Sequence, residues 1–445
     1  MNGMTVKDSL AEMEHVFRGY ISYALGVLAV ALFSMTGCVP LPGLDQVRAH
    51  SNVKLQTVKN KTHAEARSVR PQNYFIGLAL SGGGSRAANF SGNIMLELDR
   101  LGVLEHVQYI SSVSGGSLPA AYYTLFKSDR ERWNGTVVRE TMEQCFECWG
   151  FAYLLNPLRF LKFLGTSYDR TDVMAEVFDN RVFGRRTFAQ IPGNSPRPIM
   201  NSTRYIDGRS FIFTNETFDE LRSDLGKFRT AEAVMASAAY PGGFRNVTLK
   251  DFSKSTEAQT QYVHLFDAGV NDNLGIDSLL AIHRQHVEQY GAAEFQQGCL
   301  LILVDSYTPY FEKEAETRPD TRTLKDLAID TNALNAFTIF LQTKRRRTLE
   351  ALGFDKANKT DAEEEAKKAP NPLRPISFLP HLKAERVTPF SNEKTEEFEK
   401  RELVQRKRAE CRIWHIALTQ LGLREARVPD SFEKLPERYE PLYVK

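Results

Sequence analysis

The sequence has almost no surplus charge, and it lacks the common signatures of nucleotide and calcium sites. Its 57 Lys and Arg residues exceed its 55 Asp and Glu residues by two, so no global field favours a nucleic-acid partner. It contains no G-x-x-x-x-G-K-[ST] loop, no G-x-G-x-x-G loop and no D-x-[DN]-x-[DN]-G loop. The hydrophobic fraction of 42% is that of a globular chain, which at 445 residues is long enough for one large core or two ordinary ones.

Cysteine is scarce, with five residues in the whole chain. Cys145 and Cys148 form a C-x-x-C pair, but Cys299 and Cys411 stand alone, so no second pair has zinc-ligand spacing. A disulfide is possible in an exported chain. The aromatic neighbours in "MEQCFECWGF" nevertheless favour two packed cysteines on a helix, and we expect neither a zinc site nor a redox role.

Long apolar runs are also missing, except for one of fifteen residues near the N-terminus. Residues 21–35, "ISYALGVLAVALFSM", are too few for a comfortable transmembrane helix but have the length of a signal-peptide core. The run leads into Thr36-Gly37-Cys38, which resembles a bacterial lipobox and implies lipidation of Cys38. An uncleaved anchor helix is the alternative.

These features give the N-terminal part of the domain organisation. We assign residues 1–37 to a lipoprotein-type signal peptide and residues 38–70, which are polar, to a flexible tether. Val39, rather than Asp, follows the cysteine, which by the lipoprotein sorting pattern favours a lipid anchor in the outer membrane.

A glycine-rich loop follows the first strand-like segment. "NYFIGLAL" has the length of a strand and ends in Ser81-Gly82-Gly83-Gly84-Ser85-Arg86, after which apolar residues recur at helical spacing. Successive glycine N–H groups and a helix N-terminus favour an anion. Because no nucleotide motif fits, we interpret the loop as an oxyanion site, with a purely structural turn as the alternative.

A second strand–turn–helix unit carries a serine at its turn. "VQYISSV" reads as a buried strand and "LPAAYYTLF" as a buried helix, and Ser114 lies between them. Ser112 at minus two and Gly116 at plus two approximate the G-x-S-x-G elbow that presents a nucleophile. Ser112 replaces the usual glycine, so a structural turn stays open on the motif alone.

No histidine has the sequence context of a partner for this serine. His283 and His286 lie in a helical pattern, and His415 lies in "CRIWHIALTQL", which we also interpret as helical. Asp267, at the end of the strand-like "YVHLFD" and before Ala268-Gly269, could act on Ser114 without a histidine.

Together these residues resemble the patatin-like phospholipases, with four blocks in the same order. The blocks are Gly82-Gly83-Gly84-Ser85-Arg86, Ser112-Val113-Ser114-Gly115-Gly116, Ser237-Ala238-Ala239-Tyr240-Pro241 and Asp267-Ala268-Gly269. The resemblance implies an α/β fold of three layers, α/β/α, around a mostly parallel sheet. It also implies a lipid acyl hydrolase, of phospholipase A or lysophospholipase type.

The same resemblance implies a role for each matching residue. Ser114 is the nucleophile and Asp267 is the proton acceptor. The oxyanion hole comprises Gly82, Gly83, Gly84 and Arg86, and the elbow comprises Ser112, Gly115 and Gly116. The substrate is a membrane lipid or lysophospholipid, and no metal or cofactor is expected.

Two further regions complete the assignment. "ECWGFAYLLNPLRFLKFLGTSYD" combines aromatic and apolar residues with two cations, which suits a lid or a membrane-contact surface, although a buried core helix is slightly favoured. Residues 71–310 form the expected catalytic domain and residues 311–445 a charged helical region. An α/β-hydrolase with a Ser-Asp-His triad and a non-catalytic lipoprotein scaffold are the alternative functions.

Overall fold

The computed structural model describes residues 52–55, 74–256, 258–291, 298–307, 331–352, 354, 377–378 and 411–418. The expected signal peptide and Cys38 lie outside these residues. Within them, no helix is both long and apolar enough to span a membrane.

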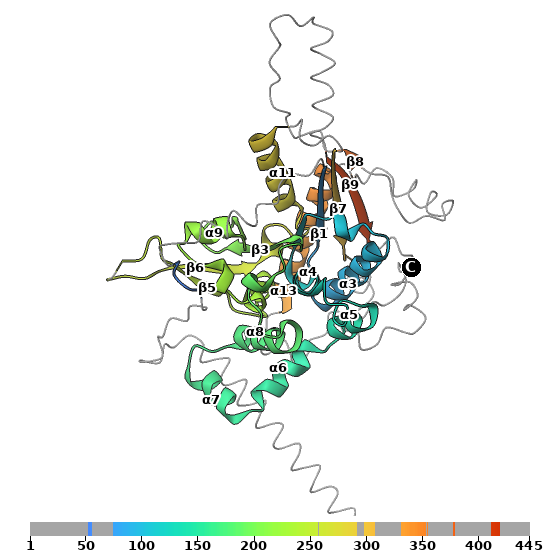
Figure 1. Cartoon of the computed structure of the whole chain (residues 1–445). Coiled ribbons are helices and arrows are strands. Elements are labelled where there is room, and N and C mark those ends of the chain that lie inside the picture. Colours follow the sequence, from blue (N-terminus) through green and yellow to red (C-terminus); the bar gives the residue numbers. More distant parts are fainter. Residues whose placement is uncertain are drawn as a thin grey trace, which may run out of the picture.

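One nine-stranded sheet organises the chain (Figure 1). Its order is β5-β6-β3-β2-β1-β7-β9-β8, with β4 paired to β3. The strands are β1 (Tyr74–Leu80), β2 (Tyr109–Ser112), β3 (Arg197–Arg204), β4 (Ser210–Ile212), β5 (Val247–Asp251), β6 (Gln261–Asp267), β7 (Gly298–Asp305), β8 (Ser377–Phe378) and β9 (Cys411–Ala417). The five central strands from β3 to β9 are parallel, while β4, β5, β6 and β8 pair antiparallel. The expected mostly parallel sheet is therefore present.

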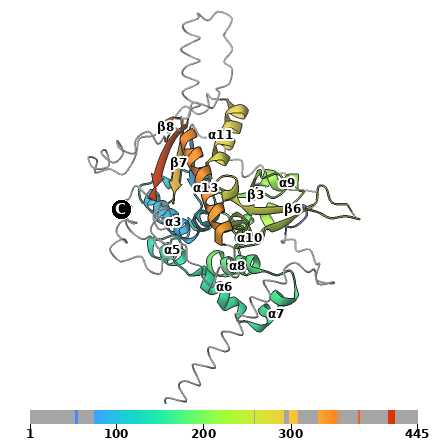
Figure 2. The same cartoon turned by 180° about the vertical axis from the view of Figure 1, so that it is seen from behind.

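Helices cover both faces of the sheet (Figures 1 and 2). They are α3 (Gly84–Arg100), α4 (Ser117–Phe126), α5 (Gly135–Met142), α6 (Phe146–Leu154), α7 (Pro157–Gly165), α8 (Arg170–Phe178), α9 (Asn215–Glu220), α10 (Thr230–Ser237), α11 (Ile276–Tyr290) and α13 (Thr331–Ala351). Alternate residues of β1 point to opposite faces, so Leu78 joins the core beneath α3, α4 and α10, and Ala79 joins the core beneath α11 and α13. These two cores make the three expected layers.

The C-terminal part differs from the expected helical region. Cys411–Ala417 forms β9, a parallel neighbour of β7, so the sheet continues beyond the assigned boundary at residue 310. Cys299 and Cys411 occupy paired positions in these two strands and form a disulfide. The interpretation of residues 411–417 as helical is therefore wrong.

Two smaller expectations also change. Cys145 and Cys148 form a disulfide at the start of α6 rather than two packed thiols. Part of the expected tether is attached to the domain: the Asn52 amide donates to the Ser223 hydroxyl at 3.1 Å and to the Lys250 carbonyl at 2.9 Å. Residues 52–55 are thus packed against the domain, unlike a flexible linker.

The aromatic segment after the elbow is only partly buried. It forms α6 and α7, and α7 has no buried residue. In α6, Phe146 belongs to the core, and Trp149 and Tyr153 pack against it. The preference for a buried helix is therefore wrong for α7, whose apolar residues are not covered by another element in the described part of the chain.

Candidate active site

Ser114 lies in a strained turn at the carboxyl edge of the sheet. It follows β2 and begins a single 3-10 turn, Ser114–Gly116, which leads into α4. Its φ angle is +50°, and only two other non-glycine residues in the described part of the chain have a positive φ. Such a conformation costs of order 1–3 kcal/mol and persists only where surrounding contacts hold it. The local geometry is that of a nucleophile elbow.

Contacts from two other elements hold this turn. The Ser237 hydroxyl, at the end of α10, accepts the Ser114 N–H at 2.9 Å and the Ser117 hydroxyl at 3.0 Å. The Asn201 amide, on β3, donates to the Ser112 carbonyl at 2.9 Å and to the Ser111 hydroxyl at 2.8 Å. The backbone on both sides of the strained residue is therefore fixed.

The elbow and the glycine loop touch each other through their backbones. A Cβ on Gly115 would lie 1.9 Å from the Gly84 carbonyl oxygen, and a Cβ on Gly116 would lie 2.7 Å from the Ser81 carbonyl oxygen. No side chain can be accommodated at the first position without moving the loop. Glycine is therefore needed at positions 115 and 116 of the elbow because the backbone of the glycine loop lies directly against them.

Two glycine amides of the loop are available as donors beside the elbow. Gly83 and Gly84 have φ angles of +145° and +61°, and their N–H groups have no hydrogen-bond acceptor among the described residues. The N-terminus of α3 begins here without a side-chain cap, which adds partial positive charge. A Cβ on Gly84 would meet no atom within 4 Å, so this donor borders open space.

Gly82 and Arg86 do not fit the expected oxyanion role in the same way. The Gly82 N–H donates to the Asn273 carbonyl at 2.9 Å, so it is already used. Arg86 Nε donates to the Ser306 carbonyl at 2.9 Å, and a Cβ on Gly83 would lie 3.3 Å from the Arg86 guanidinium. These two hydrogen bonds hold the loop to Asn273 and Ser306.

The strand register brings Asp267 to the level of Ser114. Ser112 is paired with Met200 on β3, and Ser202, two residues further on, is paired with Asp267 at the end of β6. Ser114 is likewise two residues beyond Ser112. The two residues, 153 positions apart in sequence, therefore lie at the same edge of the sheet on either side of β3.

The Asp267 carboxyl is buried and only partly satisfied. The side chain is 3% exposed, and Oδ1 accepts the Gly269 N–H at 2.7 Å. Burial raises the pKa of Asp267 to about 6, opposed by the Gly269 N–H and by the nearby Ser114 hydroxyl. Oδ2 is buried and has no hydrogen-bond partner of good geometry among the described residues. The Ser114 hydroxyl thus lies near enough to Asp267 to lower its pKa as a hydrogen-bond donor.

The described histidines have partners elsewhere. His106 contacts Tyr74, His264 contacts Thr248, and His286 contacts Tyr109. His415 contacts Asp305, and His283 lies 3.5 Å from the Cys411 sulfur. No histidine hydrogen bonds to Ser114 within the part of the chain that the structure describes.

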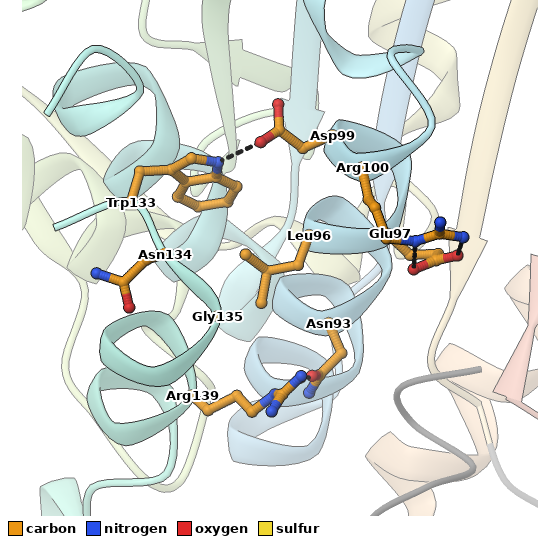
Figure 3. Close-up of a pocket in the computed structure, with 9 residues that line it drawn as sticks. All are labelled: Asn93, Leu96, Glu97, Asp99, Arg100, Trp133, Asn134, Gly135 and Arg139. Carbon is orange, nitrogen blue, oxygen red and sulfur yellow. Dashed lines mark hydrogen bonds and ion pairs between the residues drawn. The ribbon is translucent and has the colours of Figure 1, made fainter. Parts of the chain in front are cut away.

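A cavity of about 300 Å³ lies between α3 and α5, but it is not at this edge (Figure 3). It is lined by the C-terminal half of α3, whereas the glycine loop precedes the N-terminus of that helix. Its polar groups pair with each other: Asp99 accepts the Trp133 indole N–H at 3.1 Å, and Arg139 donates to Asn93 at 3.1 Å.

Residues 78–280 match the family described as patatin-like phospholipase. This region is a patatin-like phospholipase domain. The match covers the glycine loop, the elbow and Asp267.

Three solved structures are similar at low identity. Human GIVD cytosolic phospholipase A2 is 15% identical with a TM-score of 0.36, over 57% of this chain and 50% of that one. VipD from Legionella pneumophila is 12% identical with a TM-score of 0.25, over 76% and 66%. The type III effector protein ExoU is 16% identical with a TM-score of 0.21, over 68% and 67%. The chain thus spans half the length of the human enzyme, and no curated protein matches it.

The sequence did not reveal that Ser237 and Asn201 hold the backbone of the elbow through hydrogen bonds. The sequence marks Ser237 only as part of a motif, and Asn201 only as part of a glycosylation-like triplet in a strand. A serine at a helix end and an asparagine in a buried strand are usable signals, because each is a polar group that needs a partner when buried.

Proposed function

We propose that this chain is a serine lipid acyl hydrolase in which Ser114 and Asp267 form a catalytic dyad. One observation carries the proposal: a serine held at positive φ lies level with a buried carboxyl whose second oxygen has no hydrogen-bond partner of good geometry among the described residues. The N–H groups of Gly83 and Gly84, which have no acceptor within the described part of the chain, lie beside that serine. A nucleophile, a base and an oxyanion site are the groups that acyl transfer requires.

The proposed reaction begins with attack of the Ser114 hydroxyl oxygen on the ester carbonyl carbon. Asp267 accepts the hydroxyl proton on Oδ2, and the N–H groups of Gly83 and Gly84 donate to the oxyanion of the tetrahedral intermediate. The intermediate expels the alcohol, which takes the proton from Asp267 and leaves an acyl-serine. Water then attacks the acyl-serine and gives a proton to Asp267. Collapse of the second tetrahedral intermediate breaks the bond between the acyl carbon and the Ser114 oxygen, Asp267 returns its proton to that oxygen, and the carboxylic acid leaves.

The raised pKa of Asp267 supports its role as base. A carboxylate at its ordinary pKa of 3.8 is a weak proton acceptor, whereas burial raises this carboxyl to about 6. A general base works best when its pKa approaches the working pH. The burial that positions Asp267 therefore also increases its basicity.

An active-site fluorophosphonate provides the test. We expect covalent labelling of the wild-type chain at Ser114, and loss of both labelling and ester hydrolysis in Ser114→Ala, with an unchanged circular dichroism spectrum. The matched control is Ser210→Ala, which removes an exposed hydroxyl and should be labelled and active like the wild type. Turnover by folded Ser114→Ala would overturn the assignment.

The proposed substrates are phospholipids or lysophospholipids, and the products separate these possibilities. A phospholipase A releases one fatty acid and a lysophospholipid from an intact phospholipid. A lysophospholipase releases a fatty acid only from the lysophospholipid. Chromatography of the products from a phosphatidylglycerol vesicle distinguishes them. If neither the phospholipid nor the lysophospholipid releases fatty acid while a soluble short-chain ester is still hydrolysed, lipids are excluded as substrates.

We also propose that Cys38 is lipidated and anchors the chain at the outer membrane of a bacterial envelope. The support is the sequence pattern at residues 21–39. Cells supplied with labelled palmitate should incorporate it into the wild type and not into Cys38→Ser. An unlabelled wild type that still fractionates with membranes would contradict the lipid anchor.

A further inference from the structure

Several large apolar side chains are exposed on α6, on α7 and on Leu155, which lies between these two helices. Phe151 is 74% exposed, Leu155 83%, Leu158 77% and Leu161 63%. Leu158, Leu161 and Leu164 recur at a spacing of three along α7, so they share one side of that helix. We call the five residues Phe151, Leu155, Leu158, Leu161 and Leu164 the α6–α7 apolar face. Figures 1 and 2 both show α7 at the periphery, further from the sheet than α8.

The attachment of α7 explains why its apolar residues point outward. Arg159 lies 4.3 Å from the Tyr153 ring centroid and pairs with Glu176 at 3.2 Å. Lys162 lies 4.2 Å from the Tyr168 ring centroid. The helix is thus held to α6 and α8 through cations and rings, not through its leucines.

Such a face is unusual for a part of a protein that remains in water. Large exposed apolar patches bordered by polar residues mark sites of contact with a protein or a membrane. From Trp149 to Tyr168 the sequence contains two cations, Arg159 and Lys162, and no acidic residue. Arg159 already pairs with Glu176 of α8, so the positive charge beside this face comes mainly from Lys162. The partner should therefore be apolar, with anionic groups at its polar border.

We propose that the α6–α7 apolar face binds an anionic phospholipid bilayer, with its leucines inserted at the boundary between headgroups and acyl chains. Short helices with leucine and phenylalanine on one side and basic residues beside them bind membrane interfaces in this way. Each basic residue near an anionic surface contributes about 1 kcal/mol. The proposal rests on the proposed function for its biological meaning, because a lipid hydrolase must reach lipid.

The position of this face relative to the dyad fits that role. α6 packs against α8, and α8 packs against α10, the helix that ends at Ser237. Ser237 in turn holds the backbone of Ser114. The bilayer-binding helices are therefore joined to the elbow through α8 and α10.

A local fluorescence probe tests the proposal without requiring catalysis. Leu158→Trp is introduced into the full chain together with Ser114→Ala, so that no lipid is hydrolysed. With vesicles of phosphatidylglycerol and brominated phosphatidylcholine, we expect a blue shift and quenching of the emission of the introduced tryptophan, after subtraction of the Ser114→Ala parent. The matched control is Leu101→Trp, since Leu101 is also exposed, at 53%, but lies at the end of α3.

The two probes share any anchoring by the N-terminal region, so only a difference between them reports on α7. Equal quenching of both, or of neither, would overturn the proposal. If the emission of the Leu158→Trp variant changes with protein concentration in the absence of vesicles, and sedimentation shows a dimer, the face belongs to a contact with a second copy of the chain and the proposal is again overturned. If purely zwitterionic vesicles quench the Leu158→Trp emission as strongly as vesicles that contain phosphatidylglycerol, the proposed preference for anionic lipid is wrong.

An activity measurement separates this inference from the proposed function. Leu158→Asp with Leu161→Asp should lower hydrolysis of phosphatidylglycerol vesicles at least tenfold and leave hydrolysis of a soluble short-chain ester unchanged. An equal fall on both substrates would contradict a binding role. If the wild type hydrolyses neither substrate, the proposed function fails, while the fluorescence result still decides whether the face binds lipid.

Discussion

Two buried aspartates at the same edge of the sheet have opposite environments. Asp267 ends β6 and Asp305 ends β7, and their side chains are 3% and 1% exposed. Asp305 is one residue beyond Val304, which pairs with Leu80, so it lies at the level of the glycine loop. Residue type, burial and position at the edge are therefore similar for both.

Their partners differ. Arg345, on α13, donates through Nε to both oxygens of Asp305, at 3.1 and 2.9 Å, and also through its Nη2. His415 Nε2 lies 3.1 Å from the same carboxyl. Burial alone would raise the pKa of Asp305, but the Arg345 charge and the hydrogen bonds outweigh it and lower the pKa below its ordinary range.

The comparison indicates what raises the pKa of one buried carboxyl and lowers that of the other. Asp267 accepts a backbone N–H, and no cation among the described residues acts on its pKa, so burial dominates and the pKa rises. Asp305 has an arginine and a histidine, so it stays ionised and joins α13 and β9 to the sheet. Burial is common to both residues, and the partners determine whether the carboxyl can accept a proton at neutral pH.

The largest expected effect is the fall in kcat/KM when the Asp267 carboxyl is replaced. Asp267→Asn keeps the size of the side chain and removes the proton acceptor, so we expect kcat/KM for a short-chain ester to fall by about 10²–10⁴-fold. Steady-state kinetics of the purified variant measures this. Asp207→Asn, an exposed position, is the control and should retain wild-type activity. An Asp267→Asn variant within a few fold of wild type would end the proposed contrast between the two aspartates.

The second prediction concerns the paired carboxyl. Arg345→Gln leaves Asp305 buried without its main counter-charge, which should cost about 3–5 kcal/mol in the free energy of unfolding. Urea titration measures the loss, and the folded variant should retain ester hydrolysis. Arg346→Gln is the neighbouring control, because its half-exposed pair with Glu350 is worth at most about 0.5 kcal/mol.

The pH dependence of that stability has a defined direction. The folded pKa of Asp305 is below its ordinary 3.8, so the stabilisation is present above pH 3.8 and is lost as pH falls toward the folded value. The difference in the free energy of unfolding between wild type and Arg345→Gln should therefore become smaller at acid pH. A difference that is constant down to acid pH would mean that Arg345 stabilises the fold by packing instead.

Most of the proposed site could be predicted from sequence because its constraints are local. Gly115 and Gly116 are needed by the turn that also contains Ser114, and the glycine loop directly follows its strand. Steric demands of this kind appear as short motifs. Asp267 could be found because it ends a recognisable strand. The use of the Gly82 amide by Asn273 could not be found, because that contact depends on how two distant loops meet.

The C-terminal strand shows why the rest could not be predicted. Its burial alternates strictly, with Cys411, Ile413, His415 and Ala417 inward, but a histidine at an inward position breaks the apolar alternation on which a strand prediction relies. His415 is inward because it contacts Asp305. The Cys299–Cys411 disulfide was equally hidden, since it requires the register of two strands 112 residues apart.

The third prediction tests how the elbow is held. Ser237→Ala leaves the Ser114 N–H without its acceptor at a part-buried position, which costs about 1–3 kcal/mol. We expect kcat to fall about tenfold to a hundredfold, because the strained turn can relax, while KM changes little. The rate of fluorophosphonate labelling should fall in parallel. Ser117→Ala is the control: this hydroxyl donates to Ser237 and not to Ser114, so its loss should change kcat by less.

The smallest expected effect is a pH dependence that distinguishes the two carboxyls in the unmodified chain. Asp267 must be ionised to accept the Ser114 proton, and its pKa is about 6, so kcat/KM should rise with pH and level off above that value. At pH 5, one unit below, we expect about one tenth of the plateau. If the midpoint of the kcat/KM profile lies near pH 4, the proton acceptor is an ordinary exposed carboxyl. If replacing one histidine abolishes this midpoint, a Ser-Asp-His triad is favoured.

Unfolding in acid cannot produce this midpoint through Asp267 itself. Its folded pKa of about 6 exceeds its ordinary 3.8, so the folded state binds the proton more tightly. The contribution of Asp267 to stability is therefore fully present below pH 3.8 and is lost as pH rises through about 6. Acidification to pH 5 should thus lower activity while the Asp267 contribution to stability increases. Asp305 contributes in the opposite direction only at much lower pH, so kinetics and urea titrations of the same sample between pH 5 and 7 separate the base from its paired neighbour.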